Sequence, residues 1–139
     1  MILKSHARAG FTLVEVMLAI TIIGALTAVF YAGFKNYITR SKIATTKTTL
    51  KTIQSGIDMF NLDTGHYPDT LKDLIVKPAK PEMSGWSNAY IPGKESPKDA
   101  WGKPIMYNPT PGGDHEYELY SYGPDGKKAK KSDWIHASY

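Results

Sequence analysis

An apolar run of 24 residues, from Phe11 to Phe34, constrains this chain more than any other feature of its sequence. As a helix that rises about 1.5 Å per residue, the run would span about 36 Å and cross a bilayer core of about 30 Å. The apolar region of a secretory signal peptide is shorter, at about 7–15 residues. The run therefore predicts a membrane-spanning helix, with a cleaved secretory signal as the less favoured alternative.

Glu15 is the one ionisable residue inside this run. A carboxylate in a spanning helix costs about 2.5–3.5 kcal/mol, and no cation lies within one helical turn of it. Cleavage after Gly10 would give Phe11 a free amino group, whose ordinary pKa of about 8 leaves it largely cationic at neutral pH. The partner of Glu15 is then the amine of its own chain or that of a neighbouring subunit. The second arrangement would make Glu15 a register device between subunits.

Composition excludes several function classes. The chain has 139 residues, enough for one small domain beside the apolar run. It has no cysteine, which excludes a disulfide framework, a thiolate metal site and a cysteine nucleophile. The net charge of +4 is mild, and Lys4 and Arg8 precede the apolar run. No basic stripe with interleaved aromatic residues follows it, so we expect no nucleic-acid binding.

Catalytic constellations are also missing from the sequence. The four histidines show no metal-ligand spacing, and no serine lies in a nucleophile-elbow pattern. The trio Asp114, His115 and Glu116 falls on a glycine-rich connection, where a solvated turn is the simpler interpretation. We therefore predict that the protein is not an enzyme. The four histidines are His6, His66, His115 and His136.

The helix is predicted to continue from residue 35 to about 63 with a different pattern. One apolar stripe recurs at helical spacing, and the other faces carry lysines and five threonines. We therefore expect one face to pack on a small domain and the lysine-bearing faces to be solvated. Gly65 and the Tyr67-Pro68 pair predict the end of the helix. The stripe is Ile43, Leu50, Ile53, Ile57 and Phe60, and the threonines are Thr45, Thr46, Thr48, Thr49 and Thr52.

The remaining segments predict a small α+β domain. "DTLKDLIVK", capped by Asp69 or Thr70, predicts a short helix, and residues 79–103 predict an irregular loop that Trp86, Tyr90 and Trp101 hold in place. "PIMYNP" (104–109) and "YELYSYG" (117–123) predict two strands joined by a glycine-bearing loop. "DWIHASY" (133–139) is either a third short strand or a docked tail. We expect one face of the small antiparallel sheet to cover the long helix.

The amino-terminal residues also carry a family resemblance. Gly10 followed by "FTLVEVMLAITIIGALTAV" resembles the class III signal of type IV pilins and pseudopilins, with a basic leader, phenylalanine as first mature residue and glutamate as fifth. The resemblance implies that a prepilin peptidase removes leader 1–10, that Phe11 is N-methylated and that subunits assemble into a homo-oligomeric filament. It also implies a pilin-like fold, with 11–34 as transmembrane and assembly helix and 35–139 as globular domain.

Three downstream segments narrow the resemblance. "GHYPDTLKDL", "DAWGKPIMY" and "YSYGPDG" are similar, in order and spacing, to the major pseudopilin of type II secretion systems. This implies a periplasmic pseudopilus that drives protein export, with minor pseudopilins and an inner-membrane assembly platform as partners. The alternatives are a type IV pilin or competence pseudopilin and, from another class, a membrane-anchored binding module.

The resemblance also implies an orientation, with the leader in the cytoplasm and the globular domain in the periplasm. The charge pattern points the other way, because basic residues within membrane-flanking segments favour the cytoplasmic side and more of them follow the run than precede it. The orientation expected here is the one that the resemblance implies. The following basic residues are Lys35, Arg40 and Lys42.

A calcium site in the C-terminal loop is a further implication of the resemblance. The family's ligands map onto Asp125, Ser132 and Asp133, so that Ser132 stands where the family has a carboxylate. Calcium needs six to eight oxygen ligands, and its affinity depends on their charge. Two interpretations stay open: a weak calcium site, or a loop that pairs its lysines with nearby acids and needs no metal. The loop lysines are Lys127, Lys128, Lys130 and Lys131.

Overall fold

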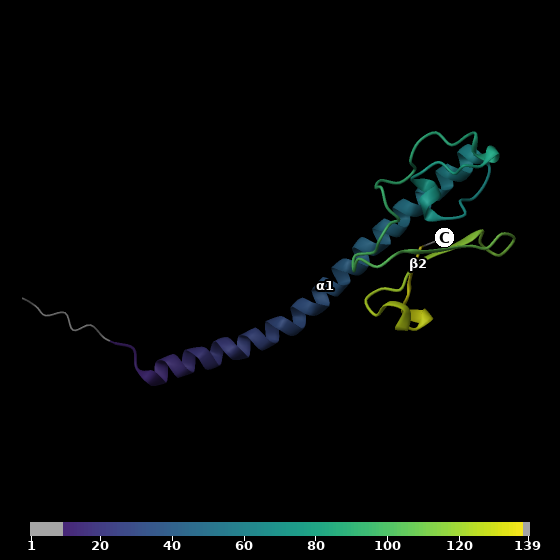
Figure 1. Ribbon diagram of the computed structural model, residues 1–139. Coiled ribbons are helices and arrows are strands. Elements are labelled where there is room, and N and C mark those ends of the chain that lie inside the picture. Colours follow the sequence, from purple (N-terminus) through teal and green to yellow (C-terminus); the bar gives the residue numbers. More distant parts are fainter. Residues whose placement is uncertain (1–9, 138–139) are drawn as a thin grey trace, which may run out of the picture. The chain divides into compact units, whose positions relative to one another are not determined.

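A long helix and a small sheet form the architecture of the computed structural model, which describes residues 10–137 (Figure 1). Helix α1 runs for 52 residues, from Leu13 to Thr64. Contacts divide the chain into two compact units, one ending at Ile38 and the other beginning at Thr39. The leader, with Lys4 and Arg8, lies outside the described residues, as do the last two residues of the expected third strand.

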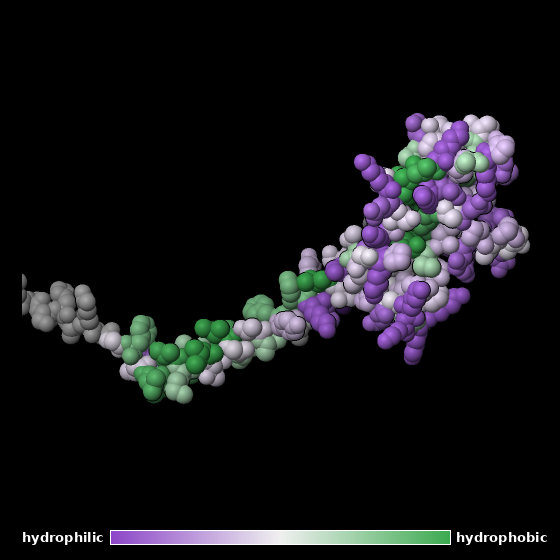
Figure 2. Space-filling view, viewed as in Figure 1, coloured by the Kyte–Doolittle hydropathy of each residue, from purple (hydrophilic) through white to green (hydrophobic). Residues whose placement is uncertain are grey.

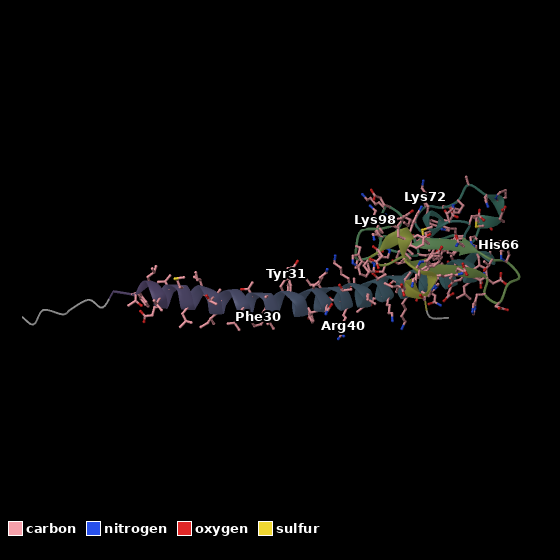
Figure 3. All side chains as sticks on the ribbon, turned by 90° about the horizontal axis from the view of Figure 1, so that it is seen from below. Phe30, Tyr31, Arg40, His66, Lys72 and Lys98 are labelled. Carbon is pink, nitrogen blue, oxygen red and sulfur yellow. The ribbon has the colours of Figure 1, made fainter. Side chains whose placement is uncertain are left out.

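Exposed apolar side chains dominate the first unit from residue 10 onward (Figure 2). Phe30 and Tyr31 project from α1 with three quarters of their surface accessible (Figure 3). The hydroxyl of Thr21 donates a hydrogen bond to the carbonyl of Met17, so this polar group is satisfied inside the helix. Within residues 10–137, this part of α1 is long and apolar enough to cross a membrane, as judged by length and composition.

The predicted stripe of the second unit is confirmed. Leu50, Ile53, Ile57 and Phe60 are fully or almost fully buried, and Ile43 packs against the same core from the edge. These residues recur every three or four positions, which places them on one side of α1. The stripe is the side of the core that the helix contributes.

Thr46 corrects one expectation about the solvated faces of α1. The sequence placed it with the exposed threonines, whereas its side chain is completely buried. Its Oγ1 accepts a hydrogen bond of 3.2 Å from the backbone N–H of Ala100. Thr46 lies four residues before Leu50, so it extends the buried stripe and uses its hydroxyl to satisfy the loop that packs there.

The helix ends where the sequence predicted. Gly65 adopts a left-handed conformation with φ of 74°, and its N–H donates to the carbonyl of Asn61 at 2.8 Å. A glycine takes this conformation without the steric cost of a Cβ atom. The expected short helix follows as a single 3-10 turn, η1 (Leu71–Leu74). Its two buried leucines are three residues apart, which fits the three-residue period of a 3-10 turn.

The irregular loop is held by its aromatic residues, as predicted. Trp86, Tyr90 and Trp101 pack against the core, and the rings of Phe60 and Tyr90 meet edge to face at 5.5 Å. A second 3-10 turn, η2, spans Pro81–Met83. Trp86 donates its indole N–H to the carbonyl of Asp73 at 3.0 Å, so the ring fastens the loop to η1.

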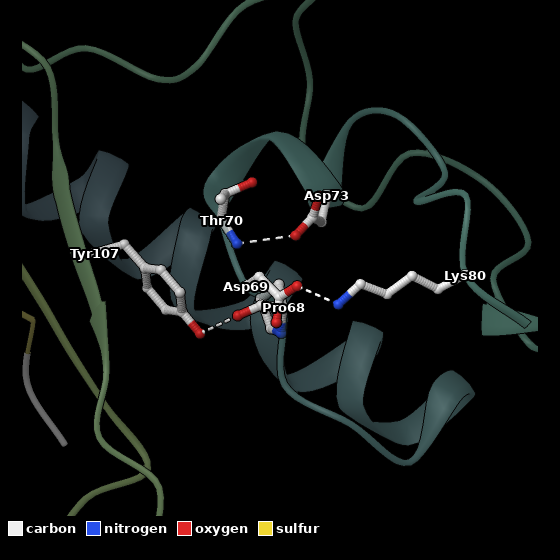
Figure 4. A network of polar contacts seen from close by, with 6 residues as sticks. All are labelled: Pro68, Asp69, Thr70, Asp73, Lys80 and Tyr107. Carbon is white, nitrogen blue, oxygen red and sulfur yellow. Dashed lines mark hydrogen bonds and ion pairs between the residues drawn. The ribbon is translucent and has the colours of Figure 1, made fainter. Parts of the chain in front are cut away.

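A polar network joins the start of this loop to the sheet (Figure 4). Tyr107 donates its hydroxyl to the carbonyl of Pro68 at 2.8 Å, and the Thr70 N–H donates to a carboxylate oxygen of Asp73 at 2.9 Å. Lys80 forms an ion pair with Asp69. Burial raises the pKa of the Tyr107 hydroxyl above its ordinary value, because the charged phenolate would lose its water.

Three antiparallel strands form the sheet in the order β1-β2-β3: β1 (Met106–Pro109), β2 (Tyr117–Ser121) and β3 (Ile135–His136). Tyr107 pairs with Leu119, and Ser121 pairs with Ile135. Both predicted strands are shorter than expected: Pro104 forms only an isolated bridge, and Gly123 has φ of 69°. The third segment is a strand, and two 3-10 turns precede it, η3 (Gly126–Lys128) and η4 (Lys131–Asp133).

The two faces of β2 are both covered. Tyr117, Leu119 and Ser121 are buried on one face. On the other face, Tyr120 is buried because the Trp134 ring stacks on it at 4.6 Å with an angle of 7° between the ring planes. The sequence alternation predicted the first face only.

Candidate functional site

Glu15 forms a local hydrogen-bonded box at the start of α1. The Glu15 N–H donates to Thr12 Oγ1 at 3.2 Å, and Glu15 Oε2 accepts from the Thr12 N–H at 3.1 Å and from Thr12 Oγ1 at 3.2 Å. This is the capping box that Thr-x-x-Glu produces, in which two backbone N–H groups of the first turn gain partners. Sequence reasoning missed Thr12, although the spacing of the two residues was a readable signal.

Only one carboxylate oxygen of Glu15 takes part in this box. Two of the three bonds end on Oε2, and the third is donated by the Glu15 backbone N–H. Within residues 10–137, Oε1 accepts no hydrogen bond. A carboxylate has several acceptor positions. The box therefore fixes the orientation of Glu15 and leaves an acceptor for another donor.

Gly10 and Phe11 precede the helix in an exposed segment. Phe11 has 86% of its surface accessible. A Cβ atom on Gly10 would meet nothing within 4 Å, and the residue does not have a positive φ. The fold therefore does not require glycine at this position. The bond between the two residues lies outside regular secondary structure.

A band of apolar side chains follows on α1 without partners in the described chain. Each has about half or more of its surface exposed, which is unusual for side chains of this kind in a globular protein. A surface of this size indicates that the segment contacts lipid or other protein chains. The band includes Leu13, Val14, Val16, Leu18, Ile20, Ile22, Leu26, Val29 and Phe30.

The three residues that the resemblance implied as calcium ligands are exposed. Asp125 precedes η3, and Ser132 Oγ donates to Asp133 Oδ1 at 3.1 Å inside η4. Within the described residues, no three His, Cys, Asp or Glu side chains gather closely enough to hold a metal ion. The loop lysines likewise form no ion pair with Asp125 or Asp133 in this part of the chain.

A buried carboxylate organises the chain beside this loop. Asp99 is only 6% exposed, and its Oδ1 accepts from the N–H groups of Trp101 and Lys103, each at 2.9 Å. Its Oδ2 accepts from the fully buried Ser121 hydroxyl at 2.6 Å, and Ser121 Oγ accepts from the Gly123 N–H at 2.9 Å. This network joins the segments "DAWGK" and "YSYG", which are far apart in the sequence.

The family comparison decides between the alternatives left by the sequence. A family model described as "Type II secretion system (T2SS), protein G" matches residues 34–135, and one described as "Prokaryotic N-terminal methylation motif" matches residues 5–31. The chain belongs to the type II secretion system protein G family. The second model spans Gly10, Phe11 and Glu15, the residues on which the resemblance rested.

Individual relatives align with this chain over most of their length. The chain is 34% identical to "Type II secretion system core protein G" of Pseudomonas aeruginosa, over 91% of this chain and 90% of the relative. It is 33% identical to the protein of the same description from Escherichia coli K12, over 89% and 87% of the two chains. It is 30% identical to the protein of the same description from Vibrio cholerae, over 90% of this chain and 86% of the relative.

A solved structure supports the fold of this protein G family member. The chain resembles the crystal structure of the major pseudopilin from the type 2 secretion system of enterohaemorrhagic Escherichia coli, with a TM-score of 0.60 and 27% sequence identity. The match covers 73% of this chain and 86% of that one. The pilin-like α+β fold predicted from the sequence is thereby confirmed, and the type II secretion interpretation stands over the pilin and competence alternatives.

Proposed function

We propose that this chain is the major subunit of a periplasmic pseudopilus, and that its mature form assembles through the exposed band of α1. The precursor would reside in the inner membrane with its globular domain in the periplasm. A prepilin peptidase would cut between Gly10 and Phe11 and methylate the new amino terminus. An assembly platform would then move subunits from the membrane into the filament, together with minor pseudopilins, to drive protein export.

The observation that carries this proposal is the exposed apolar band with Glu15 at its start. A folded domain that needed only an anchor would have no use for a carboxylate, which costs about 2.5–3.5 kcal/mol in a spanning helix. A filament would supply both a cover for the band and a charged donor for Glu15. Neighbouring helices would cover the band, and the Phe11 amine of an adjacent subunit would donate to Glu15.

The geometry around Glu15 supports such a contact. Thr12 binds Oε2, which holds the side chain in place, and Oε1 is left without a donor within residues 10–137. A charged donor in a dry environment forms a stronger hydrogen bond than a neutral one. Each subunit would therefore settle at the axial position where its Glu15 meets the amine of its neighbour.

Replacement of Glu15 by leucine tests the proposal. Glu15→Leu removes the charge and makes membrane insertion easier, so the variant should be inserted and cut normally. It should form few or no filaments, because the register contact is lost. The readouts are membrane fractionation, the mass of the processed protein and the yield of sheared filaments.

Val16→Leu is the matched control, since it introduces the same side chain one residue further along and keeps Glu15. Because this variant keeps Glu15 and an apolar side chain at position 16, it should form far more filament than Glu15→Leu. Normal filaments and normal export from Glu15→Leu would contradict the register role. That result would favour a membrane-anchored binding module instead.

A further inference from the structure

The turn that precedes η3 has an unusual feature, because two of its backbone carbonyls converge on one side chain. Lys103 Nζ donates to the carbonyl oxygen of Gly123 at 3.0 Å and to that of Pro124 at 2.6 Å. The lysine comes from the segment before β1, about 20 residues earlier in the chain. The contact therefore ties the C-terminal turn to a distant part of the domain.

The backbone of this lysine is fixed by the buried carboxylate of Asp99. Asp99 accepts from the Lys103 N–H through Oδ1, and through Oδ2 it accepts from Ser121, which in turn accepts from the Gly123 N–H. The same carboxylate thus positions the backbone of Lys103 and, through Ser121, the first residue of the turn. The ammonium reaches the two carbonyls from a scaffold that is already in place.

Gly126 shows how tightly the turn surrounds this ammonium. A Cβ atom on Gly126 would lie 3.2 Å from Lys103 Nζ and 3.7 Å from Lys103 Cε. The residue also has φ of 66°, which side chains rarely adopt. A side chain at position 126 would therefore crowd the ammonium, and glycine leaves room for it beside the carbonyls of Gly123 and Pro124.

Backbone carbonyls that converge in this way suit a cation. A divalent ion would need six to eight oxygens, and an ammonium at the same carbonyls would repel it. Asp125, Ser132 and Asp133 are exposed, and within residues 10–137 no three His, Cys, Asp or Glu side chains gather closely enough to hold a metal ion. The residues present do not fit the calcium site that the family resemblance implied.

We propose that the Lys103 ammonium is the built-in cation of the 123–126 turn and makes the C-terminal part of this domain independent of calcium. The lysine supplies one positive charge and several N–H donors without a concentration-dependent binding step. The network of Asp99 and Ser121 holds the Lys103 backbone and the Gly123 N–H in place for this contact. Lysine and metal are then alternative solutions to the same problem of holding this turn.

Thermal melting of the full-length protein in detergent, followed by near-ultraviolet circular dichroism, tests the proposal. The unmodified protein should melt at the same midpoint in excess EDTA and in excess calcium. A midpoint that falls in EDTA and recovers with calcium would overturn the proposal. This comparison needs no variant, so it remains decisive even if a substitution prevents folding.

Lys103→Met tests the role of the ammonium itself. It keeps the length of the side chain and removes the donor of the Pro124 carbonyl, and it leaves the Gly123 carbonyl with only the Gly126 N–H at 3.3 Å. The melting midpoint should fall by about 4–8 °C, which corresponds to about 1 kcal/mol of lost stability in a domain of about 100 residues. Lys128→Met removes an exposed lysine of the neighbouring loop and should leave the midpoint unchanged. Equal midpoints for Lys103→Met and the unmodified protein would contradict the proposal.

A double variant tests whether lysine and metal exclude each other. Lys103→Met with Ser132→Asp removes the ammonium from the two carbonyls and restores the carboxylate pair at positions 132 and 133. Calcium should raise the melting midpoint of this variant, and EDTA should lower it again. A double variant that ignores calcium would show that the ammonium does not occupy a position that a metal can use.

Discussion

The two parts of helix α1 have the same backbone structure and opposite surfaces. Before Thr39 its apolar side chains are exposed over much of the helix, whereas after Thr39 most of them form a single buried stripe, with Met59 and Leu62 exposed. Phe30 and Phe60 illustrate the contrast, since the first is 75% exposed and the second is fully buried. The apolar stripe of the later part is buried within its own domain, whereas the apolar side chains of the earlier part need lipid or other subunits to cover them.

This difference explains why one helix can serve two tasks. The buried stripe binds the helix to the sheet and loops of the second unit, so its stability belongs to the domain. The exposed band adds nothing to that core, so its side chains remain available to lipid or to other protein chains. Substitutions in the two parts should therefore affect different measurements.

Matched phenylalanine substitutions should give the largest contrast. Phe60→Ala removes a fully buried ring that meets Tyr90 edge to face, and it should lower the free energy of unfolding of the domain by about 3–5 kcal/mol. Phe30→Ala should leave that free energy unchanged and reduce filament yield. Denaturant titration of the full-length protein in detergent measures the first effect. A comparable loss of stability in both variants would remove the distinction between the two parts.

Threonine substitutions sharpen the comparison within the second part of α1. Thr46→Val keeps the size of the buried side chain and leaves the N–H of Ala100 without its acceptor, which should cost about 1–3 kcal/mol. Thr45→Val changes the neighbouring exposed residue and should stay within about 0.5 kcal/mol of the unmodified protein. Calorimetry on both variants separates the buried stripe from the solvated face, and equal effects would contradict this assignment.

Tyr107 and Tyr31 extend the comparison to pH, with the smallest expected effect. Burial raises the pKa of Tyr107, so the folded protein keeps this proton above pH values of about 10, where the unfolded chain loses it. The stability from this group is complete below about pH 10 and declines as the pH rises further. Tyr107→Phe should therefore flatten the alkaline loss of stability, and it should cost about 0.5–1.5 kcal/mol at neutral pH through the lost bond to Pro68.

Tyr31→Phe is the control for this pH dependence. Tyr31 is exposed on the first unit, so its substitution should change neither the stability of the domain nor its alkaline slope. Chemical denaturation at several pH values gives the slopes. The interpretation of Tyr107 would be wrong if its substitution left the alkaline slope as steep as before.

Periodic and local features of this chain could be predicted from the sequence. The stripe from Leu50 to Phe60 follows helical spacing, and Gly65 ends the helix by a rule that involves only its neighbours. Thr46 was misplaced because its partner, Ala100, is 54 residues away and threonine is usually found on solvated faces. A hydroxyl gives no sequence signal of whether a distant backbone N–H will need it.

The candidate sites show the same division between local and distant information. Glu15 was found because a charge interrupts an apolar run, and the Thr12 box was readable from four consecutive residues but was missed. Lys103 was not recognisable as a ligand of the 123–126 turn, because the contact depends on how β1 and β2 pair. The lysines that the sequence did single out lie in the loop itself and pair with neither Asp125 nor Asp133 within the described residues.

Mass spectrometry of the protein isolated from the membrane tests the central claim most directly. The claim is that a new amino terminus at Phe11 neutralises Glu15 and lets the exposed band assemble. The account predicts a mature chain that begins at Phe11 and carries one added methyl group. A protein that retains its first ten residues while it supports filament formation would contradict it.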